Sequence, residues 1–68
     1  MIVYKEVESS TISAIGYENK ELHIKFKNGT EYVYYDVPAE VYEALNSAES
    51  VGKYFAANIK NNYKYAKI

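Results

Sequence analysis

The chain has 68 residues, with eight Lys, no Arg, nine acidic residues, one His and no Cys or Trp, which gives a formal net charge of −1. A chain of this length buries only about 60% of its unfolded surface, so it has room for one small domain and none for a cleft between domains. The absence of Cys excludes disulfides and Cys-ligated metal, and the near-neutral charge argues against a strongly basic nucleic-acid binder.

The first eight residues show weak periodicity, so we expect residues 1–8 to form a lead-in or an extra short edge strand. They lack the basic stretch and long apolar run that a signal peptide requires. No segment of the chain approaches the roughly 20 consecutive apolar residues of a membrane span. We therefore expect a cytoplasmic protein with no membrane partner.

Three strands are predicted before the only proline. β-Branched and aromatic residues favour a first strand over residues 9–18, which ends in a turn at 18–20. Apolar and polar residues then alternate, so the second strand has one apolar face, made of Leu22, Ile24 and Phe26. Asn28-Gly29 indicates a hairpin, because such a turn needs a positive φ, and a third strand follows over 30–35.

The register of this hairpin decides on which face Tyr32 and Tyr34 lie. A two-residue loop pairs Phe26 with Glu31 and puts both tyrosines on the polar face. A three-residue loop with Gly29 in a bulge puts both on the apolar face and sets a lysine opposite Glu31. One residue of slip exchanges the two faces. We favour the three-residue loop, because it replaces a carboxylate beside a core Phe with a cross-strand ion pair.

Two helices are predicted after the sheet. Pro38 suits the first helical position, where its missing N–H costs nothing, and starts a helix of about ten residues. Its apolar positions are Val41, Ala44, Leu45 and Ala48. Ser50 is a good cap for a second helix. The buried stripe of that helix repeats every four residues, at Val51, Phe55, Ile59 and Tyr63.

The predicted fold class is α+β, in the order βββαα. Two helices must cover one face of a three-stranded antiparallel meander, because neither layer can bury its apolar side alone. We expect a single domain over residues 1–68, with a core of about 10–63 and a tail over 64–68.

Catalytic groups are scarce in this sequence. His23 is the only imidazole and is predicted to lie exposed on a strand. The sequence has no nucleophile motif, no paired-His metal spacing and no phosphate-binding Gly-rich loop. A Gly-Lys pair occurs at Gly52-Lys53, but Tyr54 replaces the Ser/Thr that a P-loop requires. We therefore expect no enzyme activity, no metal and no cofactor.

The charge is distributed unevenly along the chain. Residues 1–50 hold four Lys and nine acids, whereas residues 51–68 hold four Lys and no acid. Tyr beside Lys is the mixture that single-stranded nucleic acid requires, because aromatic faces stack on bases at about 1–3 kcal/mol each. The candidate nucleic-acid-binding residues are Lys53, Lys60, Lys64, Lys67, Tyr54, Tyr63 and Tyr65, with the lysines on one stripe of the second helix and its tail. The alternative is a solvated helix face, with half-buried tyrosines whose hydroxyls reach water.

Ser50 and Gly52 form a weaker candidate, an anion-binding site. The free N–H groups of a helix N-terminus attract anions, and a glycine lets a ligand approach the backbone. The alternative is a capped helix whose Gly52 packs tightly against a neighbour.

Taken in order, these positions resemble the KTSC domain, a family named after the C-terminus of some lysyl-tRNA synthetases. The matching motifs extend from about Ser10 to Tyr63 and are Ile15-Gly16-Tyr17, Leu22-x-Ile24-x-Phe26-x-x-Gly29, Tyr32-x-Tyr34, Val37-Pro38-x-x-Val41-Tyr42-x-x-Leu45, Ala48-x-Ser50-x-Gly52-x-Tyr54-Phe55 and Ile59-x-x-x-Tyr63. The chain departs from the family at Ala56, where Asn is frequent, and it has Lys or Asn where the family is richer in Arg.

The resemblance implies a free-standing bacterial member of that family, for which RNA binding has been suggested. Five motif residues are expected to be structural: Gly29, Tyr32, Tyr34, Pro38 and Phe55. We thus expect a non-catalytic RNA-binding module that uses the C-terminal Lys and Tyr side chains. The alternative is a protein-interaction or accessory domain that homodimerises through a sheet edge or a Tyr-rich patch.

Overall fold

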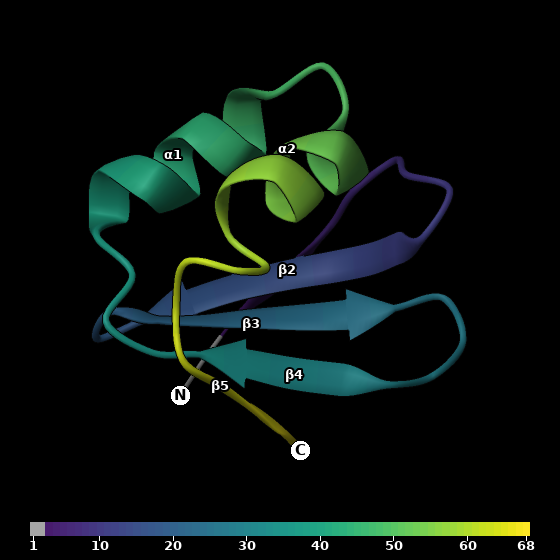
Figure 1. Ribbon diagram of the computed structural model, residues 1–68. Coiled ribbons are helices and arrows are strands. Elements are labelled where there is room, and N and C mark those ends of the chain that lie inside the picture. The colour runs from purple at the N-terminus through teal and green to yellow at the C-terminus, as the bar shows by residue number, and fades with distance from the viewer. Residues whose placement is uncertain (1–2) are drawn as a thin grey trace.

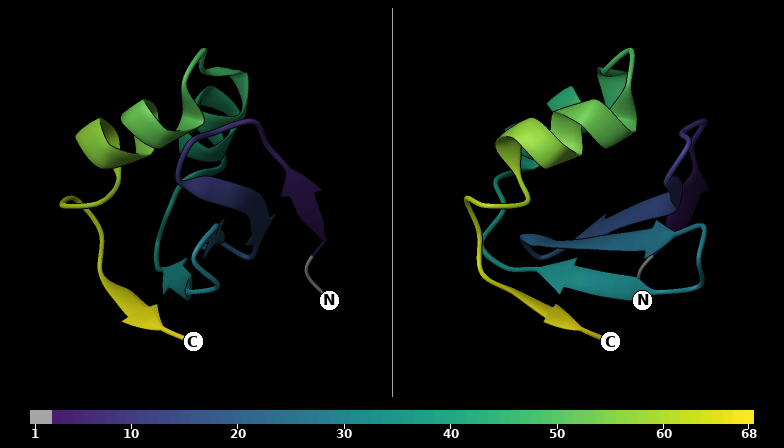
Figure 2. Two further views of the ribbon diagram at one scale, coloured as in Figure 1. Left: turned by 90° about the vertical axis from the view of Figure 1, so that its right-hand side faces the viewer. Right: turned by 45° about the vertical axis from the view of Figure 1, so that its right-hand side comes forward.

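The computed structural model describes residues 3–68, which form one antiparallel sheet and two helices (Figure 1). The strands are β1 (Tyr4–Glu6), β2 (Ile12–Glu18), β3 (Glu21–Phe26), β4 (Glu31–Tyr34) and β5 (Tyr65–Lys67), and the helices between β4 and β5 are α1 (Ala39–Ser47) and α2 (Val51–Asn58). The strands lie side by side in chain order. Both helices cover the same face of the sheet, as the sequence predicts, and β5 lies at the edge away from them (Figure 2).

The expected number of strands is wrong: within residues 3–68 the sheet has five strands and not three. Tyr4–Glu6 forms an extra edge strand, which is one of the two alternatives predicted for residues 1–8. Met1 and Ile2, which that prediction also includes, lie outside the described residues. The expected tail supplies β5, which pairs with β4. Three residues are too few for a periodicity signal, so strands as short as these cannot be seen in the sequence.

The β2–β3 turn is a two-residue loop in which both residues have positive φ. Asn19 has φ 50° and Lys20 has φ 65°, and Glu18 pairs with Glu21 across the loop. This is the geometry of the type I′ turn, whose twist matches that of the strands. The backbone C=O of Lys20 also accepts a hydrogen bond from the Val37 N–H at 2.9 Å, which ties the turn to the start of the helical layer.

The β3–β4 hairpin has the favoured three-residue register. Ile24 is opposite Tyr32, and Leu22 is opposite Tyr34, which is only 2% exposed. Gly29 has φ 91°, and the Phe26 N–H donates to the Thr30 C=O at 2.8 Å. The two tyrosines therefore lie on the helix side of the sheet.

The helices differ from prediction mainly at their ends. Pro38 is the N-cap of α1, whereas the sequence predicts it at the first helical position, and Ala44 is exposed. Ser50 caps α2 as predicted, since its Oγ accepts from the Lys53 N–H at 3.3 Å. The core between the layers contains Ile12, Ile15, Leu22, Ile24, Tyr34, Val37, Leu45, Val51, Phe55 and Ile59. Within residues 3–68, neither helix is long and apolar enough to cross a bilayer.

The other face of the sheet holds a polar cluster around Tyr4. The Tyr4 hydroxyl donates to Glu31 and lies 3.4 Å from Nδ1 of His23, while Lys25 Nζ lies 4.4 Å from the centre of the Tyr4 ring. Lys25 and Glu31 are opposite each other as expected, and both contact Tyr4. His23 is half-buried beside Tyr4, so its predicted exposure is wrong. Burial and the Glu31 carboxylate raise the pKa of Tyr4 to about 12.

Candidate nucleic-acid interface

The lysines predicted to form one helical stripe lie on separate elements. Lys53 is in the first turn of α2, Lys60 follows the helix, Lys64 precedes β5 and Lys67 is within it. All four are exposed. The single stripe is wrong because α2 ends at Asn58.

Asparagine side chains account for the early end of α2. The Asn58 side-chain amide donates to the Tyr54 C=O at 3.2 Å, and the Asn62 amide donates to the Asn58 C=O at 2.7 Å. Amide side chains that bond to the backbone offer it an alternative to further helical hydrogen bonds. The chain then turns back through residues 59–64 and reaches the sheet edge as β5, so the last lysine lies on the sheet.

The predicted tyrosines fall into two groups. Tyr54 and Tyr63 are half-buried and pack against the core, which agrees with the alternative that they are structural. Tyr65 is 56% exposed. Its ring stacks on Tyr32, with 5.6 Å between ring centres, and on Tyr34, with 5.3 Å. Of the three, Tyr65 presents the most ring surface at the sheet edge.

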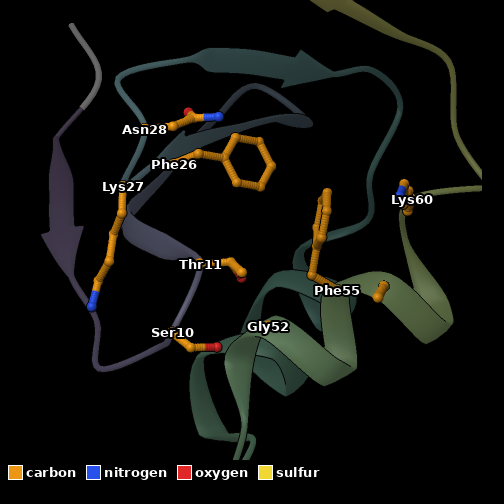
Figure 3. A pocket seen from close by; sticks show the side chains of 9 residues that line it. Ser10, Thr11, Phe26, Lys27, Asn28, Gly52, Phe55 and Lys60 are labelled. Carbon is orange, nitrogen blue, oxygen red and sulfur yellow. The ribbon is translucent and has the colours of Figure 1, made fainter.

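A groove opens between α2 and the strand ends that it covers, which we call the α2 groove (Figure 3). It has a volume of about 610 Å³ and is lined by Ser10, Thr11, Phe26, Lys27, Asn28, Gly52, Phe55, Ala56 and Lys60. Figure 3 shows Lys27 and Lys60 on opposite sides of it. Of these described lining residues, two are lysines and none is acidic. Its charge therefore favours an anion.

A row of aromatic rings connects the α2 groove to β5. Phe55 and Phe26 meet edge to face at 5.8 Å, Phe26 meets Tyr32 edge to face at 5.7 Å, and Tyr32 stacks on Tyr65. Lys67 pairs with Tyr32 across the β4–β5 ladder, so it lies on the same side of the sheet. The groove and the exposed edge are thus two parts of one surface that combines aromatic rings with lysines.

Burial changes the acidity of Tyr34, whose ring stacks on Tyr65 beside this row. Burial, with smaller contributions from Tyr65 and Tyr32, raises the pKa of Tyr34 to about 12. Tyr34 and Phe55, which are both expected to be structural, are core residues that meet edge to face at 5.3 Å. The aromatic and lysine surface therefore packs on the buried rings of Tyr34 and Phe55, which the core fixes in position.

Gly52 has a packing role beside the groove. A Cβ on Gly52 would lie 2.9 Å from Ser9 Oγ and 3.1 Å from Thr11 Oγ1, so a larger residue would push α2 away from the segment that precedes β2. The Ser50 hydroxyl, the other member of the candidate anion site, is engaged in its cap. Both observations agree with the alternative of a capped, closely packed helix.

The sequence predictions missed most of the groove. Of its lining residues, only Lys60 and Gly52 were candidates for ligand binding, whereas Phe26, Lys27 and Asn28 come from the end of β3 and its hairpin turn and Ser10 and Thr11 from the segment before β2. Within residues 3–68, no group of three or more His, Cys, Asp or Glu side chains could hold a metal ion.

The fold and site define a small α+β domain, in which two helices cover an antiparallel sheet and a basic, aromatic groove lies beside α2. The chain belongs to the KTSC domain family, whose model matches residues 8–63. It is similar in structure to a KTSC domain protein from Yersinia pestis, with a TM-score of 0.94 and 35% identity over 100% of this chain and 99% of that one.

Two relatives show the settings in which such a chain occurs. A protein of Tsukamurella paurometabola is 42% identical over 60 residues, which cover 85% of this chain and 90% of the relative. A lysine–tRNA ligase of a Nostoc species is 40% identical over 63 residues, which cover 90% of this chain and only 11% of the ligase. Similar chains thus exist both as small proteins and as a minor part of a larger enzyme.

Proposed function

We propose that this domain binds single-stranded RNA through the α2 groove and the neighbouring β5 edge. The observation that supports the proposal most is the lining of the groove, which combines two lysines and two phenylalanines with no acid among its described residues. Lysines attract the phosphate backbone, and aromatic side chains stack on unpaired bases. Sheet-edge residues Tyr65 and Lys67 would extend the same interaction beyond the groove.

The relatives add a weaker argument. The Nostoc protein that contains a similar segment is a lysine–tRNA ligase, and the name of that enzyme places tRNA among its substrates. An RNA-binding segment would have an obvious use there. Because this chain matches only 11% of the ligase, the argument concerns the shared segment and not the activity of the enzyme.

Fluorescence anisotropy with a labelled single-stranded RNA at low and moderate salt tests the proposal. We expect binding that weakens as salt rises, and that weakens further in Lys60→Gln, Lys67→Gln and Tyr65→Ala. Lys20→Gln is the matched control, because Lys20 is also exposed but lies in the β2–β3 turn. No binding at low salt, or equal losses in Lys20→Gln and Lys60→Gln, would refute the proposal. Variants of Lys53, Lys64, Tyr54 and Tyr63 test the remaining candidate residues in the same assay.

A second candidate function is protein interaction by strand addition at β5. The Lys64 C=O accepts from the Tyr35 N–H, and the Ile68 N–H donates to the Glu31 C=O, both at 2.9 Å. Because backbone groups alternate in direction along a strand, those of Tyr65 and Lys67 point away from the sheet. Exposed edges of this kind pair with other strands. Light scattering after size exclusion tests self-association; a monomer at every concentration removes the homodimer.

A further inference from the structure

The α2 groove has the size and shape of a site for a small ligand. Its volume of about 610 Å³ falls within the roughly 300–1,000 Å³ that is usual for small-molecule sites. The lining residues Gly52 and Ala56 come from α2 and have almost no side chain. They therefore leave space for a ligand next to the helix backbone. In Figure 3 the rings of Phe26 and Phe55 lie beside each other at one side of the groove; Phe55 is only 5% exposed, so Phe26 supplies most of the aromatic surface that a ligand would meet.

The polar groups around these rings are mainly hydrogen-bond donors. Asn28 Oδ1 accepts from the Thr30 N–H at 2.9 Å, which leaves its NH₂ group without a partner among the described residues. The hydroxyls of Ser10 and Thr11 lie on the β2 side, and Lys27 and Lys60 are the charged residues of the lining, although the Lys27 ammonium points away from the rings in Figure 3. Donors and cations beside an apolar floor fit a ligand that joins a flat ring to an anion.

A second hollow in the molecule provides a useful contrast. It lies beside β1 and α1, has a volume of about 260 Å³, and its charged lining residues are three carboxylates, those of Glu6, Glu8 and Glu49, and one lysine, Lys5. An anion would be repelled there. The preference for anions therefore belongs to the α2 groove and not to every concave part of the surface.

We propose that the α2 groove binds one nucleoside monophosphate unit, with the base against the half-buried Phe26 ring, which the buried Phe55 supports, and the phosphate held by Lys60. This proposal rests on the proposed RNA-binding function, because the unit is expected within an RNA strand. A free nucleotide offers the same chemistry, and the experiment separates the two sources.

The experiment follows backbone amide NMR signals while UMP, uridine, inorganic phosphate or a short oligouridine is added to the whole chain. We expect UMP to shift the amides of Thr11, Lys27, Gly52 and Ala56 saturably, and uridine and phosphate each to bind about tenfold more weakly, because each keeps only one half of the recognition. The oligouridine should shift the same amides at a lower concentration, because it also reaches β5.

A matched pair of helix variants tests the location. Ala56 and Ala57 are adjacent and exposed on α2, and only Ala56 lines the groove. We expect Ala56→Glu to weaken UMP binding about tenfold or more, because it adds bulk and negative charge in the groove, and Ala57→Glu to change it little.

The outcomes separate this proposal from the proposed function. If the oligouridine binds but UMP does not, or if Ala56→Glu and Ala57→Glu behave alike, the nucleotide site is refuted and RNA binding stands. If UMP binds in the groove and the oligouridine does not bind, the site is supported as one for free nucleotides and the RNA function fails; if the oligouridine binds only as well as UMP, the contribution of β5 fails. If neither ligand binds, both proposals fall.

Discussion

At the scale of single residues, Gly52 shows how one missing side chain sets the distance between the layers. Its Cα faces the Ser9 and Thr11 hydroxyls, and Ser9 Oγ accepts from the Thr11 and Ile12 N–H groups at 3.3 Å. The short Ser9 side chain is therefore fixed by its own hydrogen bonds and cannot move aside freely. Close packing of α2 on this segment depends on the absence of a Cβ.

Gly52→Ala should consequently destabilise the domain. On a solvent-exposed helix, Gly→Ala raises the free energy of unfolding by about 1 kcal/mol, because alanine favours the helix. Overpacking at Gly52 lowers it by about 1–3 kcal/mol, so we expect a net decrease of about 1 kcal/mol. Urea unfolding followed by circular dichroism measures it. In a Ser9→Ala background the loss should shrink, because the closest atom has gone. A variant more stable than the parent chain would contradict the packing role.

Tyr34 makes stability depend on pH in the alkaline range. Its pKa is raised to about 12 in the folded chain, mainly by burial, from the ordinary tyrosine value of 10.0. The unfolded chain therefore loses this proton first as pH rises. The contribution to stability is complete below about pH 10 and is lost between about pH 10 and 12.

Tyr34→Phe should therefore flatten the alkaline fall in stability. Urea unfolding at several pH values between about 9 and 11.5 measures the slope for the parent chain and the variant. Tyr4, whose pKa is also raised to about 12, contributes in the same direction, so Tyr4→Phe combined with Tyr34→Phe should be flatter still. Equal slopes for the parent chain and Tyr34→Phe would show that the buried hydroxyl is not responsible.

At the scale of elements, the β2–β3 and β3–β4 turns both need positive φ but place different residues there. The β3–β4 turn uses Gly29 at φ 91°, where a Cβ would meet nothing within 4 Å, whereas the β2–β3 turn uses Asn19 and Lys20 at φ 50° and 65°. Left-handed backbone costs a residue with a Cβ about 1–2 kcal/mol, and Asn tolerates it better than Lys does. Lys20 is thus a locally strained position in an otherwise favourable turn.

Lys20→Gly is expected to stabilise the domain by about 0.5–1 kcal/mol, because glycine adopts this φ without strain. Lys27→Gly is the matched control: it removes the same charge at an exposed turn residue whose φ is negative, and should destabilise by up to about 1 kcal/mol. Thermal unfolding of both variants measures the difference. A less stable Lys20→Gly would mean that the Lys20 side chain has a role that outweighs backbone strain.

The sequence was informative where the signal is local. Alternation at Leu22, Ile24 and Phe26 predicts β3, and the cost of Glu31 beside Phe26 predicts the hairpin register; the structure confirms both. Strand β5 was missed because its only support is pairing with β4, far away in the chain. The α2 groove was missed for the same reason, since it unites residues 10–11, 26–28 and 52–60. No local pattern encodes which strand ends a helix will cover.

At the scale of the whole molecule, lysines and carboxylates are distributed unevenly between the two hollows. The net charge is −1, yet the α2 groove and β5 gather lysines on one surface, while three carboxylates outnumber the one lysine in the hollow beside β1. A polyanion would therefore be drawn to one side of the domain, although long-range attraction to the whole molecule is weak. Binding of this kind depends on short-range contacts and is suppressed strongly by salt.

The salt dependence of RNA binding should report the number of groove lysines in contact with phosphate. For a single strand, each neutralised phosphate adds about 0.7 to the slope of log K against log salt concentration. Lys27→Gln and Lys60→Gln should each lower this slope by about 0.7, and the double variant by about 1.4, whereas Lys20→Gln should leave it unchanged. Anisotropy titrations at four or more salt concentrations measure the slopes. If the double variant binds more weakly but keeps the parent slope, these lysines shape the groove and do not contact phosphate, since only an ionic contact releases a counterion.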